Sequence, residues 1–368
     1  MKTTEMYTRF RRLSALGVSA LAISMSGVAI AQDDASQEPP ARPMFARFAN
    51  PQPITGVAPA ASMPTWNGSF TYQGTTYNYQ MIGADPSTNS TTVIPVVIIP
   101  VKIVIGGRRG GGATFDPQSI PSNTGGLTVI QNTVQSPIFD STTTFTSGGV
   151  NVGTTQYIDA FQRANFWGTV SSNPNYHVIL SPTVLPEVTL SPSARNGKTG
   201  APFGETVAEV NINWIDGQFH TLLTSLGITP NQFPIFLTYK TYLTSGGCCI
   251  GGYHSATGAQ SYAEFTYIDQ PGLFSQDVSA LSHEVGEWLD DPLLASTSGN
   301  QTPCGILETG DPLEGETNYG GYPYVLHGFT FNLQDLVTLP YFGAPTSTTV
   351  NGEFTFQGQH LTVCSNGS

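Results

Sequence analysis

His283 and Glu287 are the two residues of this sequence whose types and spacing most clearly indicate chemistry. They are four positions apart, and in a helix such side chains emerge one above the other on the same face. An imidazole and a carboxylate in that arrangement can bind one divalent metal ion. Glu284 directly follows His283, so its carboxylate would lie beside the ion, where it can hold a water molecule. The alternative is a solvated helix face that happens to be acidic.

The segment Asp277–Asp291 is predicted to be the helix that carries these residues. Its apolar residues recur at helical spacing, which predicts one face packed on a sheet, and they are Val278, Leu281, Val285 and Leu289. Pro292 disfavours helical geometry in the residue before it, so the helix should end at Asp291. The metal-binding pair would then emerge from a different face of a well-anchored helix.

A metal site needs a third protein ligand from a separate element, together with an open position for water. Glu308 and Asp311, three residues apart on an expected tight loop, are the best acidic candidates, and His254 is the best histidine. We expect His254 to face the site. Two alternatives stay open, namely a hydrogen-bonded network of acids without metal and a purely structural role for His254.

The four cysteines, Cys248, Cys249, Cys304 and Cys364, predict two disulfides if the chain is exported. Neighbouring cysteines rarely bond each other, because the ring they close is strained. Cys248 and Cys249 are therefore expected to pair separately with Cys304 and Cys364, in either order. Both orders would tie the loop before His254 to the loop before Glu308.

The N-terminus predicts export. Residues 1–31 combine a basic start, an apolar stretch from Leu13 to Ile30 and an Ala-Ile-Ala cleavage sequence, which is typical of a signal peptide. An uncleaved membrane anchor is the alternative. Residues 32–65 are rich in Pro and Ala without periodicity, which indicates a linker or pro-segment. The predicted location is secreted or extracytoplasmic, with no membrane association after signal cleavage.

The charge balance excludes some partners. The formal net charge is −12, and removal of residues 1–31, with four basic residues and one acidic residue, would make it −15. Nucleic acids and anionic membranes both attract clustered Lys and Arg, so neither is an expected partner. Only 10% of the residues are charged, while 39% are hydrophobic, which is enough for a folded core.

Residues 66–368 are predicted to form a single large α+β domain, in which a mixed β-sheet packs on a few helices and the C-terminal part is rich in strands and loops. The site should lie within residues 250–315. A hairpin is expected around Gln73-Gly74. Further strands are expected at Val93–Ile105, His177–Thr189, Ala208–Ile215, Phe233–Leu243 and Ser261–Ile268, and further helices at Thr155–Trp167 and Asp216–Leu226.

These site segments resemble those of a known class of proteins. Tyr253-His254, then Ser282–Glu287 and then Leu307–Asp311 are similar to the layout of secreted zincin-like proteins that carry a His-Glu-x-x-Glu helix. A more distant similarity is to the plant EXORDIUM (phosphate-induced) family. The resemblance covers about sixty residues, His254 to Gly315. It implies that His283, Glu287 and one or both of Glu308 and Asp311 group together, with Glu284 where a zincin keeps its general base.

The expected activity is metal-dependent hydrolysis of peptide or similar amide bonds, with Glu284 transferring the proton and His254 steadying the oxyanion. One divalent ion is expected. Zinc is favoured, and the carboxylate-rich ligand set leaves calcium or manganese possible. The substrate would be a peptide or an extracellular polymer. The alternative is a non-catalytic extracellular protein in which a structural metal or acid network supports binding to cell-wall or matrix polymer.

Overall fold

A long apolar strand, β3 (Thr91–Ile105), organises the sheet that supports the site. Its β-branched residues favour extended backbone, and it is buried almost continuously from Val96 onward. It pairs in parallel with β11 (Phe233–Tyr239), with β7 (His177–Val184) and with β8 (Val188–Leu190). The predicted strand at 93–105 is therefore confirmed, and the structure places it at the centre of the sheet.

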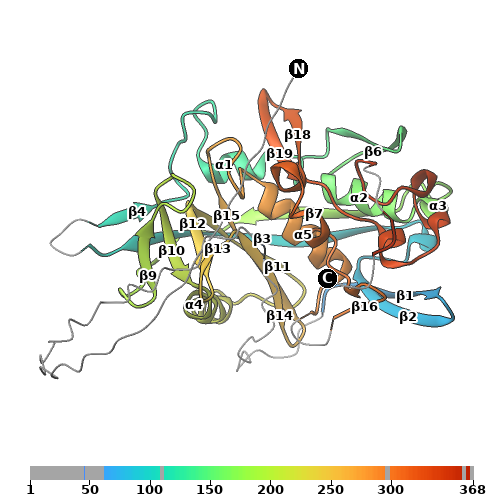
Figure 1. Ribbon diagram of the computed structural model, residues 1–368, viewed down its shortest axis with the longest axis horizontal. Helices are drawn as coiled ribbons and strands as arrows, with labels where there is room; N and C mark the ends of the chain where they lie inside the picture. The colour runs from blue at the N-terminus through green and yellow to red at the C-terminus, as the bar shows by residue number, and fades with distance from the viewer. Residues whose placement is uncertain (1–44, 46–61, 108–111, 295–298, 359–361, 365–368) are drawn as a thin grey trace, which may run out of the picture. The chain divides into compact units, whose positions relative to one another are not determined.

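The computed structural model describes residues 45, 62–107, 112–294, 299–358 and 362–364 (Figure 1). The predicted signal peptide, residues 1–31, lies outside them, as does most of the predicted linker at 32–65. The described residues belong to the compact unit that spans Pro39–Ser368. Within them, no helix has the length and apolar character required to cross a lipid bilayer.

The large sheet is mixed, as predicted for an α+β fold. Its order in the described chain is β14 (Gly252–Thr257), β15 (Gln260–Tyr267), β11, β3 and β4 (Ala113–Phe115), with β7 and β8 also paired to β3. Strands β15, β11 and β3 are parallel, whereas β14 is antiparallel to β15. The strand that contains His254 therefore joins the sheet through β15 alone.

Each face of this sheet packs against a different set of elements. Because side chains alternate along a strand, Ile94, Val96 and Ile98 of β3 join one core, which includes residues of the helices α2 (Tyr157–Asn165) and α5 (Ser279–Asp290). Val97, Ile99 and Val101 join the other core, which includes α4 (Ile212–Ser225). The site helix α5 lies on the first face, across β14 and β15 (Figure 1).

A second sheet in the described residues has the order β13 (Cys248–Ile250), β12 (Thr241–Thr244), β10 (Val207–Asn211) and β9 (Gly197–Gly200). It corrects two predicted strands. The strand expected at 233–243 divides at Lys240, whose φ of 47° turns the chain from β11 into β12. The strand expected at 208–215 ends at Asn211. The Asn211 side chain caps the start of α4, because it accepts a hydrogen bond from the Trp214 N–H at 3.1 Å.

The remaining elements are short. The predicted hairpin at Gln73-Gly74 is confirmed by the antiparallel pair β1 and β2. The other bounds are β1 (Thr65–Tyr72), β2 (Thr75–Ile82), η1 (Pro86–Thr88), α1 (Val129–Val134), β5 (Thr144–Ser147), β6 (Val150–Thr154), α3 (Trp167–Val170), β16 (Gln301–Thr302), β17 (Gly305–Ile306), η3 (Asp311–Leu313), η4 (Thr317–Gly320), β18 (Gly321–Leu326), β19 (Phe329–Gln334), η5 (Leu339–Phe342), η6 (Thr346–Thr348) and η7 (Val350–Gly352).

Helix α5 is buried along its whole length. The apolar face predicted from the sequence is confirmed, since Val278, Leu281, Val285 and Leu289 are all fully buried. The helix ends at Asp290, just before Asp291-Pro292. At Gly286 a Cβ atom would come within 2.5 Å of the Leu336 side chain, so glycine lets the segment after β19 pack closely on the helix.

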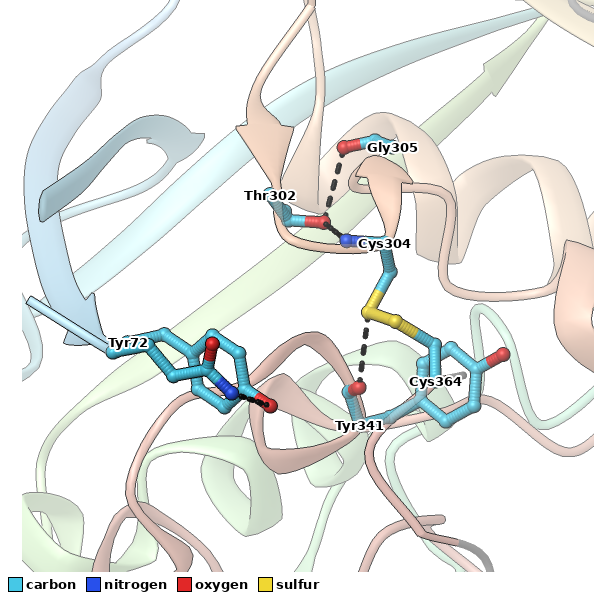
Figure 2. The surroundings of a disulfide bond; sticks show 7 residues. Tyr72, Thr302, Cys304, Gly305, Tyr341 and Cys364 are labelled. Atoms are coloured by element: carbon cyan, nitrogen blue, oxygen red, sulfur yellow. Dashed lines mark hydrogen bonds between the residues drawn. A yellow bond between two sulfur atoms is a disulfide. The ribbon is translucent and has the colours of Figure 1, made fainter. Parts of the chain in front are cut away.

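The expected disulfide pairing is wrong, although the count of two is right. Cys248 bonds its neighbour Cys249 across a cis peptide bond, and Cys304 bonds Cys364. The fold explains the outcome. Cys248 and Cys249 lie in or beside β13 of the second sheet, whereas the Cys304–Cys364 bond lies beside Tyr341 near the C-terminus, with Cys304 Sγ 3.3 Å from the Tyr341 carbonyl oxygen (Figure 2). No disulfide therefore ties the His254 loop to the Glu308 loop among the described residues.

Candidate metal centre

Three separate elements bring the predicted site residues together. Helix α5 supplies His283, Glu284 and Glu287, and β14 supplies His254. His254 pairs in register with Ala263, whose side chain belongs to the core on the α5 side of the sheet, so the imidazole points toward the helix. The turn after β17 adds Glu308, which is 2% exposed.

His283 is held in one orientation by Gln334, at the end of β19. The Gln334 amide nitrogen donates to the Gly310 carbonyl oxygen at 3.1 Å, so its oxygen must face the histidine. His283 Nδ1 then donates to Gln334 Oε1 at 2.5 Å. The proton on Nδ1 leaves a lone pair on Nε2, which lies 3.1 Å from Glu287 Oε1 and 3.7 Å from Asp311 Oδ1. This is the tautomer that a metal-binding histidine requires.

Glu287 is positioned from two sides. Its Oε1 accepts hydrogen bonds from the backbone N–H groups of Gly310 and Asp311, each at 3.1 Å. Its Oε2 lies 3.5 Å from His254 Nδ1. Gly310 is required for this arrangement, because a Cβ atom there would lie 2.3 Å from His283 Nδ1. The loop therefore approaches the helix closely enough to orient the carboxylate.

Glu284 lies beside His254 rather than on the outer surface of the helix. Its Oε2 is 3.3 Å from His254 Nδ1, and its side chain is 1% exposed. The other oxygen, Oε1, has no hydrogen-bond partner among the described residues. Glu284 thus keeps one carboxylate oxygen available for a small molecule at the site.

Glu308 is a buried carboxylate that a cation would stabilise. Neither of its carboxylate oxygens meets an N–H or hydroxyl donor within the described part of the chain, although the side chain is buried, and its close polar neighbour is the like-charged carboxyl group of Glu287. His283 Nε2 likewise makes no hydrogen bond there. A buried polar group without a partner costs about 1–3 kcal/mol, and a charged one costs more. An imidazole nitrogen and carboxylate oxygens that point into one buried space are suitable ligands for a divalent metal ion.

Burial changes the acidity of the site strongly. It raises the pKa of Glu284, Glu287 and Glu308 well above the usual carboxyl range, and repulsion from neighbouring carboxylates raises the pKa of each further. Without a cation, burial and this repulsion favour the protonated forms of these side chains. A divalent ion would favour their ionised forms, because opposite charges at short range stabilise each other in a site shielded from water.

The ligand atoms form three overlapping groups, in each of which they lie within 4.8 Å of one another. The groups consist of His254, Glu287 and Glu308; of His283, Glu284 and Glu287; and of His283, Asp311 and Glu314. The four ligands expected from the sequence therefore lie in one region but not in one group, since Glu308 groups with His254 and Asp311 with His283. Each described group contains a single histidine.

Sequence reasoning missed three contributors. Glu314 follows Asp311 by three residues, the same spacing as between Glu308 and Asp311, and that repeated spacing could have indicated it. Burial raises the pKa of Glu314 to about 7. Gln334 is remote in sequence from the other site residues and gave no local signal. Phe45, from the predicted linker, is the third.

Phe45 lies directly on the site. Its ring centroid is 4.0 Å from that of His283 and 4.9 Å from that of Phe274, and its side chain is 4% exposed. Its backbone N–H donates a hydrogen bond to Glu314 Oε1. An aromatic side chain and a main-chain donor from the chain itself thus contact two of the grouped residues.

A cavity of about 530 Å³ reaches the site from the side of the acidic loop. Its wall contains the carboxylate-bearing residues Glu308, Asp311 and Glu314, and the rest is formed by Cys304, Gly305, Ile306, Pro312, Tyr341 and Phe342. The Cys304–Cys364 disulfide fastens this wall, and Thr302 braces the turn by accepting from the Cys304 N–H at 3.0 Å (Figure 2). The site is therefore buried yet borders a space large enough for a ligand.

Comparisons with protein-family models, with curated proteins and with solved structures gave no match for this chain.

Proposed function

We propose that this protein is a secreted metal-dependent hydrolase of peptide or similar amide bonds. The observation that carries the proposal is the position of Glu284, a buried carboxylate with an unpartnered oxygen next to the grouped residues His283 and Glu287. A base adjacent to metal ligands, at a site bordered by a cavity, is the arrangement that metal-assisted hydrolysis needs. The resemblance of the helix to that of zincin-like proteins supports the same reading.

The ligands would be His283 and Glu287, completed by a carboxylate of Glu308, of Asp311 or of both. A divalent ion held there supplies positive charge, which polarises a carbonyl group and makes a water molecule more acidic. Zinc is favoured by the imidazole, while the oxygen-rich remainder also suits manganese or calcium.

Glu284 would act as the general base and acid. Its carboxylate takes a proton from the attacking water, whose oxygen bonds to the carbonyl carbon, and then passes that proton to the nitrogen as the C–N bond breaks. The buried environment that raises the pKa of Glu284 also makes its ionised form a stronger base. His254 Nδ1, 3.3 Å from Glu284 Oε2, would orient this carboxylate and steady the oxyanion.

The contacts of Phe45 support a peptide as the substrate. A polypeptide presents backbone N–H donors and side chains in alternation, and Phe45 uses one of each, on Glu314 and on His283. The two disulfides support export, because such bonds persist mainly in oxidising compartments. The predicted signal peptide at 1–31 agrees with that location.

The non-catalytic alternative has an observation in its favour. His254, His283, Glu284, Glu287 and Glu308 are each no more than 2% exposed, which suits a structural metal. The adjoining cavity favours catalysis instead, because a structural site is normally closed.

The test compares Glu284→Gln with Asp290→Asn, an isosteric change of another buried acid on the same helix. Both purified variants are assayed for metal content and for cleavage of a fluorogenic peptide library. We expect Glu284→Gln to retain the metal and lose at least about a hundredfold in rate, the scale of general acid–base catalysis, while Asp290→Asn keeps both. Equal rates for Glu284→Gln and wild type, or no cleavage by metal-loaded wild type, would refute the proposal.

A further inference from the structure

The carboxylate of Glu287 faces two histidines that come from different elements. Its Oε1 lies 3.1 Å from His283 Nε2 of α5, and its Oε2 lies 3.5 Å from His254 Nδ1 of β14. The two oxygens of one carboxylate point away from each other, so they can bind two different ions. A bridging carboxylate of this kind is a common element of two-metal sites.

The other ligands divide in the same way. His254, Glu287 and Glu308 form what we call the strand group, and His283, Asp311 and Glu314 form the loop group. Within each group the ligand atoms lie within 4.8 Å of one another. Among the described residues, each group holds only one of the two histidines. One ion placed to use either group would therefore leave the other histidine without a metal.

The charge of the site gives an independent argument. Glu284, Glu287, Glu308 and Glu314 form no ion pair with a lysine or arginine in the described part of the chain. The charged partners of Glu284, Glu287 and Glu314 there are histidines. With Asp311 the site has five carboxylates, and if all are ionised, one divalent ion would leave three negative charges uncompensated. Two divalent ions would leave one, and uncompensated buried charge is strongly unfavourable.

The unpartnered atoms also belong to both groups. Both oxygens of buried Glu308 lack a donor among the described residues, and so does His283 Nε2, which is fully buried. Glu308 belongs to the strand group and His283 to the loop group. Each group thus has at least one buried ligand atom that protein hydrogen bonds do not satisfy.

We propose that the site binds two divalent metal ions, one in the strand group and one in the loop group, with Glu287 bridging them. The inference deepens the proposed hydrolase function, and the role of the second ion rests on that function. The second ion would help to stabilise the negative charge that develops in the transition state. Glu284 belongs to neither of these two groups, although its ligand atom also lies within 4.8 Å of those of His283 and Glu287, and it remains the base. His254 would then serve as a ligand instead of steadying the oxyanion.

The test loads metal-free protein with Mn²⁺ and measures both stoichiometry and magnetic coupling. Elemental analysis after gel filtration should give two ions per chain, and electron paramagnetic resonance should show an exchange-coupled pair in place of the six-line spectrum of isolated Mn²⁺. One ion per chain, no bound ion, or two ions without coupling would overturn the inference.

Two variants remove one group at a time. Glu308→Gln changes only the strand group and Glu314→Gln only the loop group, so each should bind one ion and lose the coupling. Asp290→Asn should still bind two. Circular dichroism and intact disulfides by mass spectrometry confirm folding. If both single-group variants keep two coupled ions, the ligand assignment is wrong.

These outcomes separate the inference from the proposed function. Two coupled ions in a protein that cleaves no amide bond would preserve the inference and refute the hydrolase. One ion with Glu284-dependent cleavage would preserve the hydrolase and refute the two-metal site.

Discussion

Gln334 accepts the Nδ1 proton of His283 at 2.5 Å while its amide nitrogen donates to the Gly310 carbonyl oxygen. One side chain thereby fixes the tautomer of His283, the proposed metal ligand, and connects it to the loop that carries Asp311. Partners of this kind that orient a ligand typically change metal affinity by a factor of 10 to 100 when removed.

Gln334→Leu should therefore weaken metal binding by about 10- to 100-fold, because His283 loses the acceptor that keeps Nε2 unprotonated. Competition with a chromophoric chelator measures the affinity. Gln334→Glu, which keeps an acceptor for His283, should bind metal more tightly than Gln334→Leu. Affinity in Gln334→Leu equal to that of wild type would show that the tautomer is set by another group.

Gly310→Ala should displace the His283 ring, because the new Cβ atom would lie 2.3 Å from Nδ1. We expect loss of metal affinity together with a lower free energy of unfolding, since Glu287 also loses well-placed N–H donors. Gly315→Ala on the same loop is the matched control, because a Cβ atom there meets nothing within 4 Å. Similar affinities in the two variants, by the same chelator competition, would contradict the close approach at Gly310.

Phe45→Ala should increase the rate of peptide cleavage at low substrate concentration. The Phe45 ring covers His283, and its removal frees the surface that a substrate would use. The change should lower KM with little effect on kcat, as expected for relief of competition. Tyr77→Ala, in the β1–β2 hairpin, serves as a control for loss of an aromatic ring. A higher KM in Phe45→Ala would mean that Phe45 supports the site instead of obstructing it.

Asp290 should make the protein less stable as the pH rises. Burial raises its pKa from 3.8 to about 7 in the folded chain, whereas the unfolded side chain ionises near pH 4. Between these values the unfolded state releases a proton that the folded state keeps, so the free energy of unfolding falls through this window and the cost stays constant above it. The contribution is at most about 4 kcal/mol.

In the structure the Gln162 amide nitrogen donates to Asp290 Oδ1 at 2.9 Å. Asp290→Asn removes the titration while keeping an oxygen that can accept this hydrogen bond. Urea unfolding at pH 4.5 and at pH 7.5 should show a smaller loss of stability in the variant than in the wild type. The comparison of slopes with pH, not of absolute stability, decides the outcome. Parallel pH profiles would refute the raised pKa.

The sequence predicted well what depends on neighbouring residues. Helical spacing placed His283, Glu284 and Glu287 on one buried helix and located its end, and β-branched composition identified β3. It failed where distant parts of the chain decide. The disulfide pairing depends on which cysteines the two sheets bring together, and the turn at Lys240 depends on a positive φ that no local pattern indicated.

The site divides along the same line. Glu308, Asp311 and His254 could be nominated because acids and histidines cluster in that region of the sequence. Gln334 and Phe45 could not be nominated in this way. Gln334 contacts His283 across 51 residues of sequence, and Phe45 places its ring on His283 from a remote segment. The assignment of Glu308 and Asp311 to different histidines also follows from tertiary packing alone.

The central claim is that the His283–Glu287 helix forms a metal centre, and anomalous X-ray diffraction from crystals grown with the purified protein's own metal tests it most directly. We expect an anomalous peak about 2.0–2.2 Å from His283 Nε2 and from a Glu287 oxygen, with carboxylate ligands from the 308–314 loop. Absence of any peak there, with Glu287 and Glu308 joined by a shared proton, would contradict the metal centre and the hydrolase built on it.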